Sequence, residues 1–238
     1  MEIFDIVDEE GMPTGQPVSR EEAHAKGIRH RTAHIWVIRR RGPENTAAGR
    51  CEDVGAGRCE DAGAGRCEGA GAGRGEGRAD AAESGQRLHY DILLQKRAME
   101  KDSFPGRYDT SSAGHIHAGD EPRVSAIREI GEELGIRAKP QDLAYAGKFS
   151  INYREEFHGK PFLDNEVSFV YVYDRPVELK DLVLQKEEVE DAGWFDLEET
   201  LEAVRRHDPK YCVPEGGLKV LVAYLRENNA GIADIYKK

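Results

Sequence analysis

The sequence predicts an α/β protein in which a β-sheet is covered by helices on both faces. Segments rich in β-branched and aromatic residues alternate along the chain with amphipathic segments, and this interleaving is typical of a sheet between helices. The chain has 238 residues, enough for one large domain even when residues 41–87, whose composition cannot form a core, are set aside.

The N-terminal part is expected to contain two strands with a short helix between them. Ile3–Val7 and His34–Arg40 are predicted strands because both are rich in apolar β-branched and aromatic residues. The helix is expected over Ser19–Ala25, since Ser19 and Glu22 have the spacing of a capping box, in which each side chain accepts a hydrogen bond from the other residue's backbone amide.

A Gly-rich octapeptide repeat interrupts the pattern between Gly49 and Asp80. Its cysteines recur with neither a zinc spacing nor a disulfide framework: Cys51, Cys59 and Cys67. Because the repeat offers almost no apolar side chains, residues 41–87 are expected to be a disordered insertion, with an interaction tether as the alternative. The flanking strands, His34–Arg40 and Leu88–Arg97, would form a hairpin, so the chain is predicted to be a single domain, 1–238, with an expanded loop.

The C-terminal half is expected to alternate helices and strands. The main helix begins near Asp120, has Pro122 in its first turn, and ends near Gly135. The later strands are expected at Leu143–Arg154, Val167–Asp174 and Ala192–Asp196, and the later helices at Leu197–Arg206 and Gly217–Glu227. The last helix has one apolar stripe, made by Leu218, Leu221, Val222 and Leu225.

Three carboxylates crowd the end of the main helix. Glu129, Glu132 and Glu133 are three or four residues apart, so they share one helix face. Like charges at this spacing repel one another, and a solvated helix gains nothing from them. A hard divalent cation bound between the carboxylates would turn this repulsion into attraction. Mg²⁺, with Mn²⁺ as the alternative, suits a set of carboxylates that leaves room for water and phosphate oxygens.

These residues resemble the Nudix box, a glycine followed by a spaced R-E-aliphatic-x-E-E-x-G-aliphatic pattern. Eight positions match: Gly114, Arg128, Glu129, Ile130, Glu132, Glu133, Gly135 and Ile136. Asp120 stands where the pattern has glutamate, and a capping or structural hydrogen bond is expected of it. The resemblance implies the Nudix fold, a mixed sheet between helices with the box as loop-helix-loop, and hydrolysis of a diphosphate linkage by water attack at phosphorus.

The same resemblance assigns roles within the box. Glu129, Glu132 and Glu133 match the metal ligands, with Glu132 and Glu133 also expected to be catalytic. Arg128 matches an arginine that orients a neighbouring glutamate, and a surface salt bridge is the alternative. Gly114 is expected where the backbone passes close to metal or substrate, and a plain turn glycine is the alternative.

Outside the box, the chain is similar to the Nudix branch related to isopentenyl-diphosphate isomerase. In that isomerase three histidines and two glutamates hold a metal, and five residues here are close to the corresponding places: His24, His30, His115, Asp164 and Glu166. The spacing from His24 to His30 is one residue shorter, and Asp164 replaces a glutamate. Ala113 stands where the isomerase places its catalytic cysteine, so isomerisation lacks a proton-transferring group and hydrolysis is favoured.

Further site residues are expected around this metal. His115 is expected to be a ligand, and His30 a ligand or substrate contact, with a structural histidine as the alternative for each. Glu166, after an apparent turn at Phe162–Glu166, is expected to complete the metal shell or act as general base, with a solvated glutamate at a strand edge as the alternative. Arg97 and Lys101 are expected to contact phosphate, the alternative being a solvated surface.

Composition limits the partners. The formal net charge of −11 argues against nucleic acid as a general partner, but a bound metal allows an anionic substrate. We expect a small-molecule diphosphate substrate, no membrane, a cytoplasmic location and compatibility with a homodimer. The isomerase and a non-catalytic diphosphate-sensing module stay open as alternatives. One sequence does not select the substrate, or which aromatic side chain contacts its leaving group among Phe104, Tyr108, Phe149, Tyr153 and Phe157.

Overall fold

The computed structural model describes residues 2–41, 88–101, 103–157 and 159–233. The octapeptide repeat and its expected disorder therefore lie outside the described residues. Among the residues that the structure covers, no helix combines the length and the apolar composition needed to cross a bilayer.

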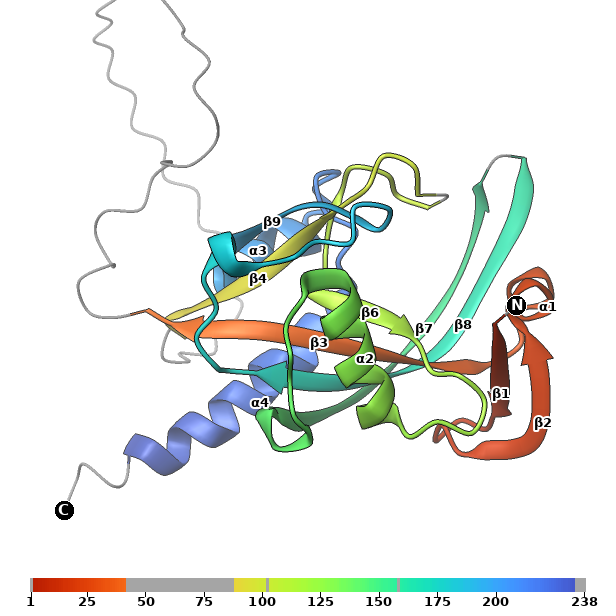
Figure 1. Cartoon of the computed structure of the whole chain (residues 1–238), viewed down its shortest axis with the longest axis horizontal. Helices are drawn as coiled ribbons and strands as arrows, with labels where there is room; N and C mark the ends of the chain where they lie inside the picture. Colours follow the sequence, from red (N-terminus) through yellow and green to blue (C-terminus); the bar gives the residue numbers. More distant parts are fainter. Residues whose placement is uncertain (1, 42–87, 102, 158, 234–238) are drawn as a thin grey trace, which may run out of the picture. The chain divides into compact units, whose positions relative to one another are not determined.

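A mixed seven-stranded sheet forms the centre of the fold (Figure 1). Its path runs β5-β4-β3-β8-β7, with β6 paired to β3 and β9 paired to β4. The pairing of β3 with β8 is parallel, and the other pairs in the sheet are antiparallel. The strands are β3 (His30–Arg40), β4 (Tyr90–Arg97), β5 (Tyr108–Asp109), β6 (Ser112–His115), β7 (Leu143–Phe157), β8 (Lys160–Tyr173) and β9 (Val189–Asp196). A separate two-stranded sheet joins β1 (Ile3–Val7) to β2 (Pro13–Ser19).

Helices cover both faces of the large sheet, which confirms the expected α/β class. On one face, Ile35 and Val37 of β3 pack with Ile130 and Leu134 of α2 (Pro122–Leu134). On the other face, Trp36 and Ile38, the alternate residues of β3, pack with the C-terminal helices α3 (Leu197–Arg205) and α4 (Glu215–Ala233). Because successive side chains of a strand point to opposite faces, β3 contributes to both cores.

Local sequence signals predict an end of each of two helices, α1 (Arg20–Lys26) and α2. Ser19 is the N-cap of α1, and its hydroxyl accepts from the Glu22 amide at 3.3 Å. Gly135 ends α2 with φ of 72°, a left-handed conformation that favours glycine. Glu121, next to Asp120, is at the N-cap position, so the helix begins near Asp120 as expected. Asp120 makes a structural hydrogen bond in place of a cap: its carbonyl oxygen accepts from Arg31 Nη2 at 3.2 Å.

Strand positions differ more from the expectation. β2 and β6 were not expected, because β2 has two prolines and a glycine and β6 is the short polar segment Ser-Ala-Gly-His. The turn expected at Phe162–Glu166 is wrong, since these residues lie inside β8, where Asn165 pairs with Asn152 of β7. Asp and Asn favour turns, but here β7 and β8 continue as one long hairpin, which extends beyond the body of the sheet (Figure 1).

Candidate active site

The helix α2 carries the three box glutamates on the face next to β6. Glu129 and Glu133 are buried, whereas Glu132 is exposed. Arg128 lies between two of them: its Nη2 is 2.8 Å from Glu129 Oε1 and its Nη1 is 3.2 Å from Glu132 Oε2. The same guanidinium donates to the His115 carbonyl oxygen at 3.0 Å. Arg128 therefore contacts two glutamates and links the helix to β6.

Gly114 makes room for the Glu129 carboxylate. A Cβ atom at this position would lie 2.1 Å from Glu129 Cδ, far inside van der Waals contact. Gly114 belongs to β6 and has no positive φ, so the alternative of a plain turn glycine is wrong. The residue is needed because the Glu129 side chain approaches the β6 backbone closely, and the expected approach to metal or substrate stays a prediction.

Burial favours the protonated form of two carboxyls of α2, those of Glu129 and Glu133, when no cation is present. Desolvation raises the pKa of Glu133 to about 8, although the Ala113 amide donates to its Oε2 at 3.2 Å. Desolvation likewise raises the pKa of Glu129 to about 7, against the lowering effect of Arg128. A divalent cation would compensate this desolvation, so the local electrostatics fit a metal bound by carboxylates.

A second group of candidate ligands comes from four separate elements. His24 of α1, His30 at the start of β3, His115 at the end of β6 and Glu166 of β8 each offer one ligand atom, and these atoms lie within 4.8 Å of one another. Glu166 Oε1 is 3.7 Å from Nε2 of both His30 and His115. Asp164, two residues before Glu166 on the same strand, approaches His24 Nε2 at 3.8 Å.

The hydrogen bonds of this histidine cluster leave metal-ligating atoms without partners. His24 Nδ1 donates to the Arg20 carbonyl oxygen, and His30 Nδ1 to that of Ile28, each at 2.9 Å. The Nδ1 atoms of His24 and His30 therefore carry the ring protons, and their Nε2 atoms present lone pairs to the centre of the histidine cluster. His30 Nε2, His115 Nε2 and Asp164 Oδ1 are buried without a hydrogen-bond partner. Imidazoles and carboxylates with unsatisfied atoms fit a divalent metal.

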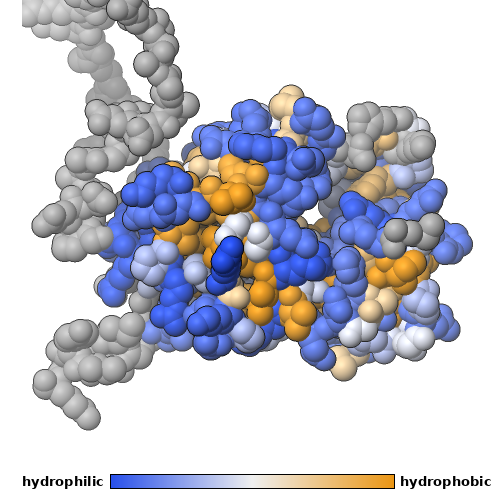
Figure 2. All heavy atoms as spheres, viewed as in Figure 1, coloured by the Kyte–Doolittle hydropathy of each residue, from blue (hydrophilic) through white to orange (hydrophobic). Residues whose placement is uncertain are grey.

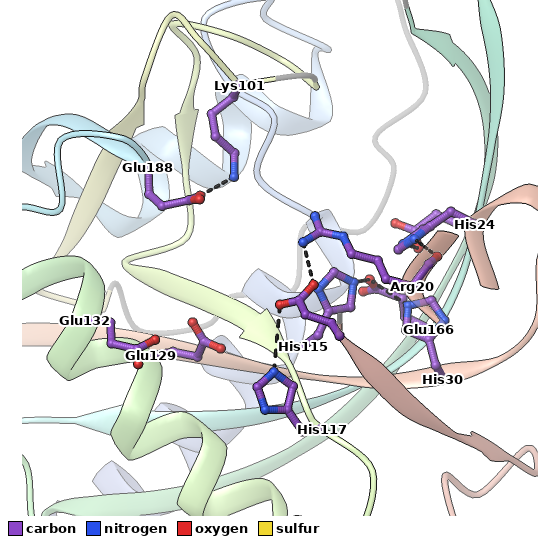
Figure 3. A network of polar contacts seen from close by, with 12 residues as sticks. Arg20, His24, His30, Lys101, His115, His117, Glu129, Glu132, Glu166 and Glu188 are labelled. Atoms are coloured by element: carbon purple, nitrogen blue, oxygen red, sulfur yellow. Dashed lines mark hydrogen bonds and ion pairs between the residues drawn. The ribbon is translucent and has the colours of Figure 1, made fainter. Parts of the chain in front are cut away.

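Both groups border one hollow of the surface. Figure 2 shows an opening between the surface over α2 and β6 and the surface over the β7–β8 hairpin. In the close view of Figure 3, His115 lies between the α2 glutamates and the rest of the histidine cluster. Gly114 and His115 are sequence neighbours on β6. Gly114 leaves space for Glu129 of α2, and His115 belongs to the histidine cluster, so the four-residue strand β6 connects the two groups.

The two expected phosphate contacts have different surroundings. Arg97 donates to the Ser103 carbonyl oxygen and hydroxyl at 3.0 Å and pairs with Asp109 at 3.1 Å. These bonds hold the loop after β4, and the expected contact of Arg97 with phosphate stays a prediction. Lys101 instead forms an ion pair with Glu188 and lies at the hollow (Figure 3).

The aromatic candidates for the leaving-group contact fall into two sets. Phe104 lies 5.3 Å from Phe157 and 6.4 Å from Tyr153, ring centre to ring centre, on the hairpin side of the site. Phe149 packs instead with the core below α4, and Tyr108 packs against Phe195. The first three residues therefore stay candidates for the leaving-group contact, and Phe149 and Tyr108 do not.

Sequence reasoning missed two contributors to the site. Phe162 stacks on His24 with ring centres 4.4 Å apart, and Glu188 pairs with Lys101. Phe162, Asp164 and Glu166 have the period of two that places strand residues on one face, so this signal was present in the segment interpreted as a turn. No local pattern marks Glu188, which stands in a charged run.

Together, the mixed sheet, the box helix and the glycine beneath Glu129 define a Nudix domain. The NUDIX domain family matches residues 81–215, and the chain belongs to this family. His24 and His30 lie before the matched stretch and reach the site through α1 and β3.

Relatives of two kinds resemble the chain. Nudix hydrolase 3 of Arabidopsis thaliana is 31% identical over 212 residues, covering 88% of this chain and 21% of that protein. An uncharacterized Nudix hydrolase of Clostridium acetobutylicum is 32% identical over 188 residues, covering 79% of this chain and 66% of that protein. The isopentenyl-diphosphate Delta-isomerase of Dinoroseobacter shibae is 26% identical over 196 residues, covering 82% of this chain and 80% of that protein.

Proposed function

We propose that this protein is a metal-dependent Nudix hydrolase that cleaves a diphosphate linkage in a small phosphorylated metabolite by water attack at phosphorus. The observation that carries the proposal is the carboxylate group of α2, in which two buried glutamates have raised pKa values and Gly114 leaves space for one of them. Such an arrangement is unfavourable in a protein without a bound cation.

The candidate ligands divide between the two groups. Glu129, Glu132 and Glu133 would hold Mg²⁺, or Mn²⁺ as the alternative, and Glu166 with His115 would complete the shell on the side of the histidine cluster. When bound, the ion supplies charge neutralisation for the phosphates and a more acidic water. Mg²⁺ prefers oxygen ligands, whereas imidazoles favour transition metals, so the site's two halves have different metal preferences.

The chain's own residues would position the reacting groups. Arg128 holds Glu129 and Glu132 in place through both of its terminal nitrogens. Lys101 would supply a positive charge for a phosphate oxygen, and the Gly114 backbone leaves space for the Glu129 carboxylate. His30, with Nε2 3.7 Å from Glu166 Oε1, is the proposed substrate contact of the histidine cluster. Glu133 and Glu166 are the two candidates for the general base that takes a proton from water, since both are buried at the hollow.

A Mg²⁺-dependent activity screen over a library of diphosphate compounds tests the proposal. Glu132→Gln and Glu133→Gln should each lower kcat by roughly two orders of magnitude or more, because each loses a charge that holds the metal. Glu121→Gln, an exposed glutamate at the start of the same helix, is the control and should leave kcat unchanged. Unchanged turnover in both site variants would refute the metal role.

The histidine cluster favours one alternative activity. Its three histidines and Glu166, with Asp164 in place of a second glutamate, resemble the set that the isomerase resemblance implies, but Ala113 has no proton to transfer. Incubation with isopentenyl diphosphate and Mg²⁺ separates the two reactions: release of phosphate or a monophosphate supports hydrolysis, and formation of dimethylallyl diphosphate supports isomerisation. The proposal includes a cytoplasmic location.

A further inference from the structure

The two carboxylate oxygens of Glu166 have different surroundings. Oε1 lies 3.7 Å from Nε2 of both His30 and His115, and Figure 3 shows the carboxylate next to these two imidazoles. Oε2 instead accepts a hydrogen bond from the Thr32 hydroxyl at 2.9 Å. One oxygen is therefore directed at the candidate metal ligands, and the other is bound to a side chain of β3.

Strand pairing places Thr32 at the centre of this arrangement. On β3, Thr32 is opposite Ser168 of β8 on one side and opposite His115 of β6 on the other. Its side chain shares a face of the sheet with His30, two residues earlier, because strand side chains alternate. Thr32 and Ser168 are 4% and 0% exposed, so water does not compete for their hydroxyls.

A second hydrogen bond sets the direction of the first. Thr32 Oγ1 and Ser168 Oγ are 2.9 Å apart. A hydroxyl has one proton, and a carboxylate that binds a metal can only accept, so the Thr32 proton goes to Glu166 and Ser168 donates its own proton to Thr32. The chain of donors from Ser168 through Thr32 to Glu166 therefore keeps the carboxylate in one orientation.

A glutamate side chain without such a partner rotates about several bonds, and metal binding would have to restrict this rotation. Hydrogen bonds that hold a ligand in its binding orientation strengthen metal binding for this reason. At Glu166 the hydrogen bond uses Oε2 and leaves Oε1, the oxygen that is equally distant from the two imidazoles.

We propose that Thr32, supported by Ser168, is a positioning residue that holds Glu166 for metal binding through Oε1 alone. This role rests on the proposed function, because that function assigns Glu166 to the metal shell. It also assigns a purpose to two buried hydroxyls that lie outside both the Nudix box and the group of candidate ligands.

The chain allows closely matched variants. Thr32→Val replaces the hydroxyl with a methyl group and keeps the branched shape, whereas Thr32→Ser keeps the hydroxyl. Ser168→Ala removes only the supporting hydrogen bond. Thr200→Val is the control, because Thr200 is a threonine buried to a similar degree, 2% exposed, in α3, and none of the described candidate ligands belongs to α3.

The experiment measures Co²⁺ affinity from the visible absorption of the bound ion, since imidazoles favour transition metals. The absorption that is lost in His24→Ala identifies the ion bound at the histidine cluster. Thr32→Val should weaken this binding about tenfold or more, and Thr32→Ser should restore it to within about threefold of the full chain. Ser168→Ala should weaken it about threefold, and Thr200→Val should not change it.

Equal Co²⁺ affinities of the full chain and Thr32→Val would overturn the role of Thr32. Equal losses in Thr32→Val and Thr32→Ser would also overturn it, because they would show that packing and not the hydroxyl matters. The absence of any Co²⁺ absorption that depends on His24 would do the same. Thermal unfolding without metal shows whether each variant is folded. If Thr32→Val does not fold, Ser168→Ala decides, and an unchanged affinity in that variant contradicts the role.

Hydrolysis of diphosphate compounds is measured separately, so the two claims can fail independently. A protein that shows the Thr32 effect on Co²⁺ but hydrolyses no diphosphate would retain this role and lose the proposed function. A protein that hydrolyses a diphosphate but binds Co²⁺ equally well as Thr32→Val would lose this role alone.

Discussion

At the scale of single residues, the site depends on the absence of a side chain at Gly114. Gly114→Ala would place a Cβ 2.1 Å from Glu129 Cδ, so the carboxylate must move away from its place at β6. We expect Mn²⁺ affinity and kcat to fall by about tenfold or more, as when a residue supporting a metal ligand is lost. Calorimetry and steady-state kinetics would show this change.

Gly131 is the matched control for that substitution. It lies in the interior of the same box helix, where an added Cβ would meet only the Ile136 carbonyl oxygen at 3.7 Å, an ordinary contact. Gly131→Ala should leave metal binding unchanged and increase the free energy of unfolding by up to about 1 kcal/mol, because alanine favours helix over glycine. Equal effects of the two substitutions on Mn²⁺ affinity would show that Glu129 does not need the space.

The raised pKa values of two residues predict how metal affinity depends on pH. In the metal-free protein, Glu129 and Glu133 titrate at about 7 and about 8, above the ordinary value of 4.5. Below these values both carboxyls are protonated, and a metal must displace the protons. The apparent Mg²⁺ affinity should therefore rise as pH increases from 6 to 8.5 and level off above that.

Calorimetry in buffers with different heats of ionisation measures the protons released on binding. The number of protons released on Mg²⁺ binding should be large at pH 6.5 and small at pH 9. In Glu133→Gln, the increase in apparent Mg²⁺ affinity near pH 8 should disappear. An apparent affinity that does not vary between pH 6 and 8.5 would show that these carboxyls are not ligands.

At the scale of secondary-structure elements, the sequence predicts the helices and strands whose signals lie within one short segment. The box helix could be located because its glycine, proline and carboxylate positions lie within one segment, and the helix ends follow from Ser19 and Gly135. β2 and β6 could not be located, because their prolines, glycines and small polar residues carry no strand signal. These strands form only because a partner strand supplies hydrogen bonds, β1 for β2 and β3 for β6.

The histidine cluster could be suggested by resemblance, but its geometry depends on strand register. Parallel pairing of β3 with β8 sets His30 opposite Glu166, and antiparallel pairing of β3 with β6 sets Thr32 opposite His115. The Thr32 hydroxyl then donates to Glu166 Oε2 at 2.9 Å. A shift of one residue in either register would turn these side chains to the opposite face, and no local sequence pattern encodes the register.

The β3–β4 hairpin also predicts that residues 42–87 are dispensable for folding. Next to the insertion, Arg41 binds Asp91 at 2.5 Å and Asp196 at 2.6 Å, and its amide donates to the His89 carbonyl oxygen. These contacts between described residues hold the ends of β3 and β4 together. Replacing residues 42–87 with a four-residue linker should increase the free energy of unfolding by about 2 kcal/mol, because the loop to be closed is shorter.

Chemical denaturation and steady-state kinetics test the shortened chain. Its kcat should equal that of the full chain, since every described site residue lies outside the replaced segment. A shortened protein that folds but binds Mn²⁺ more weakly would show that the insertion takes part in the site. In that case the single-domain prediction would need an additional contact from the octapeptide repeat.

At the scale of the whole molecule, one hollow combines an acidic helix face with a histidine cluster. The carboxylates of α2 match the hydrolase box, and the histidine cluster matches the set implied by the isomerase resemblance. Ala113, between Ser112 and Gly114 on β6, stands where the isomerase resemblance implies a catalytic cysteine, and alanine has no proton to transfer. We therefore interpret the molecule as a hydrolase that retains the second ligand set.

The most direct test is the binding of Mn²⁺ to the full chain and to Glu133→Gln, followed by electron paramagnetic resonance with and without methylenediphosphonate. The account predicts that the full chain binds the ion, that the diphosphonate strengthens binding, and that the variant binds about tenfold more weakly or worse. Failure of the full chain to bind Mn²⁺ under either condition would contradict the claim that the carboxylates of α2 are a metal site.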